Sequence, residues 1–239
     1  MNLHKARSTR LGSLDKEQFK PLFTLAAFIT ILVVFSLINP VFLSFTNLHS
    51  VLLNAVPVGL VSIGMCVCVM GGYFDMGVGF VASMAGVLVG PMMDRGFSVP
   101  IIILTALVMG LFCGALSGFT VSFLNMNAWI STFALQQIYR TILYLATDGI
   151  PFTLAAEKYN AFTKLGRIRV FGAIQLPIVV LLLVYVGSFL FLKYRRLGRS
   201  VYLVGNNASA ANICGTNLHL TRMFMFMFSL LFVIGFNCI

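Results

Sequence analysis

Long apolar runs separated by short polar segments dominate the chain. Roughly 20 apolar residues cross the hydrocarbon core of a bilayer as a helix, and six runs reach about that length. They cover about residues 21–43, 51–70, 77–93, 99–124, 128–147 and 174–192. A seventh run begins near residue 222, and the sequence stops inside it at Ile239. The pattern predicts an all-α integral membrane protein, a polytopic helix bundle of about six full spans plus the start of a seventh.

The basic residues gather in two places, and both predict the same orientation. One group lies in the first twenty residues: Lys5, Arg7, Arg10, Lys16 and Lys20. The other group lies beyond the sixth run: Lys193, Arg195, Arg196, Arg199 and Arg222. Basic residues between spans favour the cytoplasmic side of a membrane. Residues 1–20 are therefore predicted to be a cytoplasmic basic tail and residues 21–239 a transmembrane domain. Within that domain the segment 148–173 falls outside and the loop 193–221 falls inside.

Composition supports lipid as the solvent of this chain. Hydrophobic residues make up 59% of the sequence and charged residues 9%, with a mean hydropathy of +0.99. A soluble domain needs about 25% charged residues to cover its surface. The net charge of +10 is placed between apolar runs rather than on a soluble fold, so it does not indicate nucleic-acid binding.

Several chemistries lack the residues they need. The sequence has no phosphate-binding Walker-type loop, so ATP hydrolysis is expected to reside in a partner chain. The three histidines lie outside the centres of the spans, and Cys66 and Cys68 have no histidine nearby to complete a metal site. No cofactor, metal site or catalytic residue set is expected, which disfavours an intramembrane enzyme.

Small residues recur inside the fourth run. Gly110, Gly114 and Gly118 form two overlapping pairs at a spacing of four. Such a stripe lets two helix backbones approach closely within lipid. Close packing is the predicted role.

The segment Gly71–Gly79 between the second and third runs is the first functional candidate. Four glycines and one acid in nine residues make a poor helix. Asp75 is the acidic residue closest to the apolar core, and such residues are functional candidates by default. A short turn in which Asp75 caps the third span is the equally open alternative.

The fifth run carries the second candidate. Trp129–Phe133 is followed by Gln136 and Arg140, which share one helix face at a spacing of four. An arginine in an apolar run has to pair, face a cavity or extend to the headgroups. A polar stripe along a pathway and a structural pairing with a neighbouring span both remain open.

Two loops complete the set of candidates. The external segment 148–173 is long for a connection and is either a docking surface or a solvated loop. In the cytoplasmic loop 193–221, Asn207 is expected to cap a short helix over residues 208–214 that Gly215 ends. This short helix either contacts a soluble partner or rests on the lipid headgroups.

The four segments resemble the ribose/xylose/galactose-type permeases of bacterial ABC importers, in the same order along the chain. The matching residues are Gly71-Gly72-Tyr73-Phe74-Asp75-Met76-Gly77-Val78-Gly79, then Trp129-Ile130-Ser131-Thr132-Phe133 with Arg140, then Thr147-Asp148-Gly149-Ile150-Pro151, and finally Leu197-Gly198-Arg199 with Gly205 to Gly215.

The resemblance implies a permease subunit that carries a monosaccharide across the bacterial inner membrane as a multi-pass protein. It implies three partners: a separate ABC ATPase, a periplasmic sugar-binding protein and a second permease copy, making a homodimer. It assigns coupling to the ATPase to Arg199, Gly205, Asn207, Ala210, Ala211 and Gly215. It assigns a pathway or packing role to Gly71, Gly72, Asp75, Gly79, Thr132 and Arg140.

Two departures from the family pattern support an alternative. Ser209 and Asn212 stand where the coupling loop of the family has Glu and Arg, so charge-assisted contacts with an ATPase would be lost. The family also continues through further spans after this loop. The alternative is a truncated permease paralogue that inserts into the membrane without transporting.

Overall fold

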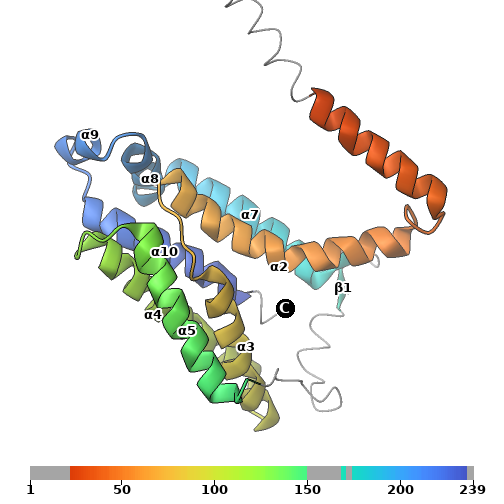
Figure 1. Ribbon diagram of the computed structural model, residues 1–239, viewed down its shortest axis with the longest axis horizontal. Helices are drawn as coiled ribbons and strands as arrows, with labels where there is room; N and C mark the ends of the chain where they lie inside the picture. The colour runs from red at the N-terminus through yellow and green to blue at the C-terminus, as the bar shows by residue number, and fades with distance from the viewer. Residues whose placement is uncertain (1–21, 150–167, 171–173, 236–239) are drawn as a thin grey trace, which may run out of the picture. The chain divides into compact units, whose positions relative to one another are not determined.

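The computed structural model describes residues 22–149, 168–170 and 174–235, with side chains placed up to residue 232 (Figure 1). The predicted basic tail 1–20 and residues 150–167 and 171–173 of the predicted external segment lie outside the described residues. The chain divides into two units, residues 1–51 and 52–239, which are considered separately.

The first unit contains the helix Leu22–Ile38 and the start of α2 (Phe45–Met70). The predicted first span continued to residue 43, but the helix ends at Ile38 because Asn39 precedes Pro40, which disfavours helical backbone at Asn39. α2 begins before the predicted residue 51 because Ser44 caps it: the N–H of Asn47 donates to Ser44 Oγ at 3.3 Å.

The second unit is built from α2, α3 (Val78–Asp94), α4 (Val99–Ser122), α5 (Ala128–Thr147), α7 (Leu176–Tyr194), α8 (Arg196–Asn206), α9 (Ala208–Ile213) and α10 (Leu218–Gly235). Within the described residues, α2, α4 and α7 are long and apolar enough to cross a membrane, and Leu22–Ile38, Val78–Asp94 and Leu218–Phe232 are shorter apolar helices. The fold is therefore that of a mostly helical membrane protein.

Two short strands depart from the all-α prediction. β1 (Arg169–Val170) pairs antiparallel with β2 (Ile174–Gln175). The N–H of Leu176 then donates to the carbonyl of Ile168 at 2.9 Å, so the hairpin leads directly into α7.

α10 begins at Leu218 rather than near the predicted residue 222. Asn217 provides the reason, because its side chain accepts a hydrogen bond from the N–H of Leu220 at 3.0 Å and its carbonyl accepts from Thr221 at 3.1 Å. The helix start thus depends on a polar cap placed before the apolar run.

Close helix packing places α10 at the centre of the second unit. A Cβ added at Gly114 or Gly118 of α4 would lie 2.6 Å and 2.9 Å from the Cα atoms of Met227 and Met223. A Cβ at Gly64 of α2 would meet the backbone of Ser229. Only glycine permits these approaches, so the predicted packing role of the glycine stripe is confirmed at Gly114 and Gly118 by their contact with α10.

The buried side chains form a continuous link between α2, α8, α9 and α10. One cluster contains Val67, Cys68, Val121, Leu192, Val201, Val204, Ala211, Met225 and Phe226. α8 was not predicted, although Leu197, Val201 and Val204 recur at helical spacing in the sequence. The arginines in this segment indicated a basic loop between two spans instead of a helix.

Candidate functional site

The segment between α2 and α3 is a tight turn in which Gly71, Asp75 and Gly77 are buried and Gly72 and Phe74 are exposed. Gly72 has a φ of +83°, a backbone conformation that favours glycine, and the N–H of Tyr73 donates to the carbonyl of Cys68 at 2.9 Å. Gly71 is buried against Met225 of α10, so closely that an added Cβ would overlap the Met225 sulfur. Gly79, by contrast, has open space around its Cβ position.

Asp75 is buried within this turn, with 1% of its surface exposed. Its Oδ1 accepts a hydrogen bond from the N–H of Gly77 at 2.8 Å, whereas Oδ2 has no partner among the described residues. The carboxyl group therefore shapes the turn before α3. It does not cap the helix as the alternative predicted, because α3 begins after Gly77 without a side-chain cap, and it is buried rather than hydrated. An unpaired buried carboxyl oxygen is costly and marks a candidate site.

Other buried polar side chains come from the helices around Asp75. A Cβ added at Gly77 would lie 3.5 Å from a ring carbon of Tyr139 on α5. The Tyr139 hydroxyl lies 3.5 Å from the carbonyl oxygen of Cys113 on α4. Ser117 and Ser229 are fully buried, and their hydroxyl oxygens have no partner among the described residues. Sequence reasoning missed these three residues because they sit singly in apolar runs.

Thr132 connects α5 to the same turn. Its hydroxyl oxygen accepts a hydrogen bond from the N–H of Met76 at 3.1 Å and donates to the carbonyl of Ala128 at 2.8 Å. Thr132 is fully buried, so its hydroxyl satisfies a backbone donor that has no helical partner. The structure therefore places Thr132, which the resemblance assigned to the same pathway or packing group, in contact with the Gly71–Gly79 segment.

Arg140 lies away from this group. Its side chain is exposed, and within the described part of the chain it makes no hydrogen bond or ion pair. Gln136, one helical turn earlier, has a buried Oε1 without a partner among the described residues. The structure thus brings Asp75 and Thr132 together but not Arg140.

The loop predicted to couple to an ATPase contains two helices. Asn207 caps α9, since its side chain accepts from the N–H of Ala210 at 3.0 Å, and Gly215 follows the helix with a φ of +79°. The predicted short helix is therefore present, although it ends at Ile213 instead of residue 214. Ala211 faces the core with 3% exposure, and Ile213 is 87% exposed.

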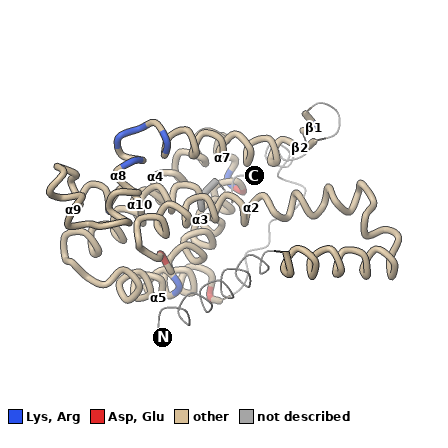
Figure 2. Tube along the Cα trace, turned by 90° about the horizontal axis from the view of Figure 1, so that it is seen from above, with Lys and Arg blue, Asp and Glu red and all other residues tan. Residues whose placement is uncertain are grey.

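Arg199 has a local structural role. Its Nη1 donates to the carbonyl of Tyr194 at 2.8 Å, where α7 ends and α8 begins. Lys193, Arg195, Arg196 and Arg199 form the group of basic residues at this turn (Figure 2). Positive charge near a helix C-terminus is electrostatically favourable.

Gly205 joins the two candidate regions. A Cβ at Gly205 would overlap the carbonyl oxygen of Met70, and it would lie 3.2 Å from the Cα of Gly71. α8 therefore packs directly on the end of α2 where the Asp75 turn begins. Within the same turn, the ring of Tyr73 lies 6.1 Å from the ring of Phe226 and 5.7 Å from the guanidinium group of Arg222, both on α10.

We refer to Met70, Gly71, Gly205 and Met225 as the junction. It connects the exposed helix α9, through α8, to the buried carboxyl of Asp75. Among the described residues, no three His, Cys, Asp or Glu side chains gather in a way that could hold a metal ion. The junction thus links α8, α2 and α10 through close backbone and side-chain contacts.

Comparison with known proteins gives one family match. Residues 47–232 match the model of the branched-chain amino acid transport system / permease component family. This segment includes the junction, Asp75, Thr132 and α9. No solved structure matches the chain.

Individual relatives are sugar or signal-molecule permeases. The chain is 28% identical to the ribose import permease protein RbsC of Haemophilus influenzae over 85% of its own length and 63% of the relative. It is 30% identical to the autoinducer 2 import system permease protein LsrC of Enterobacter sp. strain 638 over 84% of the chain and 59% of the relative. It is 29% identical to the galactofuranose transporter permease protein YtfT of Escherichia coli over 86% of the chain and 61% of the relative.

These matches confirm the predicted resemblance to monosaccharide ABC permeases. The matched part of the chain spans about three fifths of the length of these relatives.

Proposed function

This chain belongs to the family of branched-chain amino acid transport system permease components, and we propose that it is a membrane-spanning permease subunit of an ABC importer. The substrate class we propose is a monosaccharide or a similarly small polyhydroxylated solute, because the relatives named above import ribose, galactofuranose and autoinducer 2. The location we propose is the bacterial inner membrane, with the N-terminus in the cytoplasm.

The contact between Gly205 and Met70 is the observation that carries the coupling part of the proposal. α9 is the docking element for a separate ATPase, and its exposed Ile213 inserts into an apolar pocket of that partner. When the ATPase moves α9, the buried Ala211 and the packed faces of α8 move with it. Because α8 rests on the backbone of α2 at Gly205, this movement reaches the turn that holds Asp75.

The Asp75 turn is the element that responds. It is held at three points by two helices: by Met225 of α10 at Gly71, and by Tyr139 and Thr132 of α5 near Gly77 and at Met76. A turn rich in glycine can change its backbone angles at low cost. We infer that it changes the packing of α3 against α5 and so opens and closes the pathway.

The full transporter in this proposal contains a second permease copy, the ATPase and a periplasmic sugar-binding protein. The second copy encloses the pathway together with this chain. The binding protein delivers the solute from the opposite side of the membrane. These partners follow from the family and not from the described residues.

Co-purification from native membranes in mild detergent tests the proposal. We expect mass spectrometry to identify an ABC ATPase with the unaltered chain and to find it strongly reduced with Ile213→Asp, because a buried carboxylate would oppose docking. Ile168→Asp is the matched control, since it places the same change at an exposed isoleucine before α7.

Recovery of the unaltered chain without any ATPase would contradict the proposal. It would favour the second candidate, a permease paralogue that inserts without transporting. Equal ATPase recovery with Ile213→Asp and Ile168→Asp would keep the transporter assignment but remove α9 as the docking element.

A further inference from the structure

An open apolar groove runs along one face of α10. Its volume is about 470 Å³. Its lining residues are all apolar: Leu111, Leu197, Leu220, Met223, Phe224, Met227, Phe228 and Leu231. Six of them belong to α10 and recur every three or four residues, so they form one stripe of that helix.

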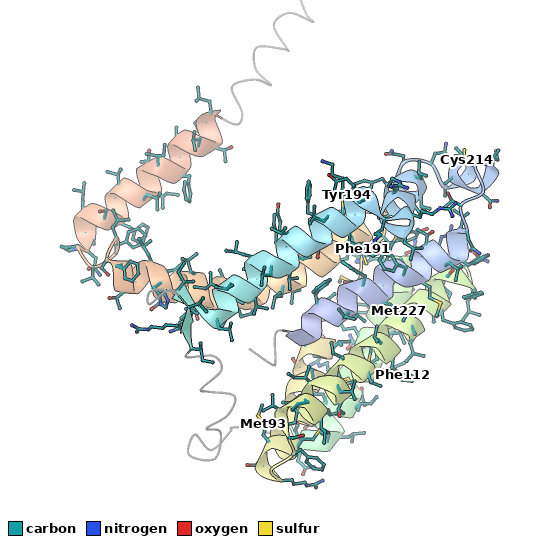
Figure 3. All side chains as sticks on the ribbon, turned by 180° about the vertical axis from the view of Figure 1, so that it is seen from behind. Met93, Phe112, Phe191, Tyr194, Cys214 and Met227 are labelled. Carbon is teal, nitrogen blue, oxygen red and sulfur yellow. The ribbon has the colours of Figure 1, made fainter. Side chains whose placement is uncertain are left out.

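Neighbouring helices give the groove its walls. Figure 3 shows α10 between α4 and α7. Phe112 is labelled on α4, Met227 on α10 and Phe191 on α7. Phe191 of α7 does not line the groove itself, but its ring stacks on Phe224 at 5.5 Å and on Phe228 at 5.9 Å and so supports two aromatic rings that do. The groove is thus shaped by interlocked aromatic side chains and offers a polar ligand nothing to bind.

One end of the groove lies at a strongly basic turn. Leu197 of α8 lines the groove, and it directly follows Arg195 and Arg196, which are both exposed. Lys193 precedes them and is exposed as well. Figure 2 shows these cations together at the turn between α7 and α8. The acidic residues in the described ranges are Asp75, Asp94 and Asp148. All three are far from this turn in sequence, and none lies on α7, α8 or α10.

The flanking helices indicate that this turn lies at the membrane surface. α8 buries Val201 and Val204 and carries its arginines on the exposed side. Tyr194 is 62% exposed and Tyr202 is 44% exposed. Exposed tyrosines next to arginines at the end of an apolar helix are typical of the headgroup region.

We propose that the groove is a binding site for one anionic glycerophospholipid of the adjacent leaflet. An acyl chain occupies the apolar stripe of α10, and the phosphate and headgroup lie against Lys193, Arg195 and Arg196. Apolar lining and positive charge are arranged end to end, as they are in such a lipid. An apolar helix of another polypeptide would fill the stripe but would leave these cations without a counter-charge.

The proposal requires only that the chain is inserted in a membrane. It does not depend on transport or on an ATPase partner. Evidence against the proposed transport function would therefore leave the lipid site unaffected. Evidence against the lipid site would likewise leave the transport function unaffected.

Native mass spectrometry of the purified full chain tests the site. The chain is titrated with phosphatidylglycerol and, separately, with phosphatidylcholine of the same acyl chains. We expect preferential binding of one phosphatidylglycerol. Each positive charge near a membrane surface contributes about fivefold to anionic lipid binding, so Lys193→Gln with Arg195→Gln and Arg196→Gln should lower the affinity by about 100-fold.

Two further variants and one control separate charge, groove and folding. Met227→Trp fills the groove and should prevent binding while leaving all cations in place. Arg195→Lys with Arg196→Lys keeps the charge and should retain binding within about fivefold. Arg169→Gln removes a charge at the opposite end of α7 and should leave the affinity unchanged.

Three results would overturn the proposal. The first is equal binding of the two lipids by the unaltered chain. The second is unchanged phosphatidylglycerol binding in both the triple glutamine variant and Met227→Trp, when both remain monodisperse and helical by circular dichroism. The third is efficient disulfide formation between two copies of a Met227→Cys variant in native membranes, which would make the groove a helix–helix interface.

Discussion

Gly205 of α8 lies against the carbonyl of Met70, so closely that the structure leaves no room for a Cβ atom. The two residues are far apart in sequence and belong to helices that carry different candidate roles. Their contact joins the end of α2 to the helix that leads into α9. In the proposed coupling mechanism, it is the place where a change on the exposed loop reaches the buried turn.

Replacing Gly205 tests the importance of this contact for stability. Gly205→Leu should lower the free energy of unfolding by about 1–3 kcal/mol, because the Met70 backbone cannot rotate away as a side chain would. Thermal unfolding in detergent measures the change. Gly187→Ala of α7 is the matched control, since its Cβ meets nothing within 4 Å, and it should raise stability by about 0.5–1 kcal/mol. Equal effects of the two substitutions would show that Gly205 is not tightly packed.

Asp75 is expected to act first as a hydrogen-bond acceptor in its own turn. Asp75→Asn keeps an oxygen for the Gly77 N–H and removes a costly buried charge, so thermal stability should be retained or increased. Asp75→Ala leaves the Gly77 N–H unpaired and should cost about 1–3 kcal/mol. Thermal unfolding of both variants in the same detergent measures the difference. A large loss of stability in Asp75→Asn would indicate that the charge itself has a partner.

Thr132 provides a second hold on the turn. Thr132→Val keeps the shape of the side chain but leaves the Met76 N–H without its acceptor, which should cost about 1 kcal/mol. Thr132→Ser retains the hydroxyl and should cost less. Hydrogen exchange measured by mass spectrometry should be faster over residues 71–77 in Thr132→Val than in Thr132→Ser. Identical exchange in the two variants would exclude this hydrogen bond as a constraint.

Gly215 tests whether the end of α9 matters for coupling. With a φ of +79°, Gly215→Val is strained by about 1–2 kcal/mol, whereas asparagine tolerates this conformation better. We expect Gly215→Val to insert normally but to reduce ATPase co-purification and monosaccharide uptake, with Gly215→Asn closer to the unaltered chain. Unchanged uptake in Gly215→Val would count against the coupling assignment.

The sequence by itself determined that this is a mostly helical membrane protein and where several of its helices begin and end. The apolar runs predicted α3, α4, α5 and α7 to within about two residues at each end, because polar and turn-forming residues interrupt these runs. Of these four helices, α4 and α7 are long and apolar enough to cross a membrane. Asn207 and Gly215 marked the start and end of α9, since capping and left-handed backbone depend on residues close in sequence. Where a cap was overlooked, as at Asn217 before α10, the predicted boundary was wrong.

Tertiary structure decided which of these elements touch. The glycine stripe of α4 predicted a close approach, but its partners Met223 and Met227 lie more than a hundred residues later in the sequence. Likewise, Gly205 and Asp75 belong to two separate candidate segments of the sequence, and the packing of α8 on the end of α2 brings these segments together. Such contacts arise from the fit of whole helix faces in a solvent that gives apolar surfaces no preferred partner, so the periodicity of each helix alone could not specify them.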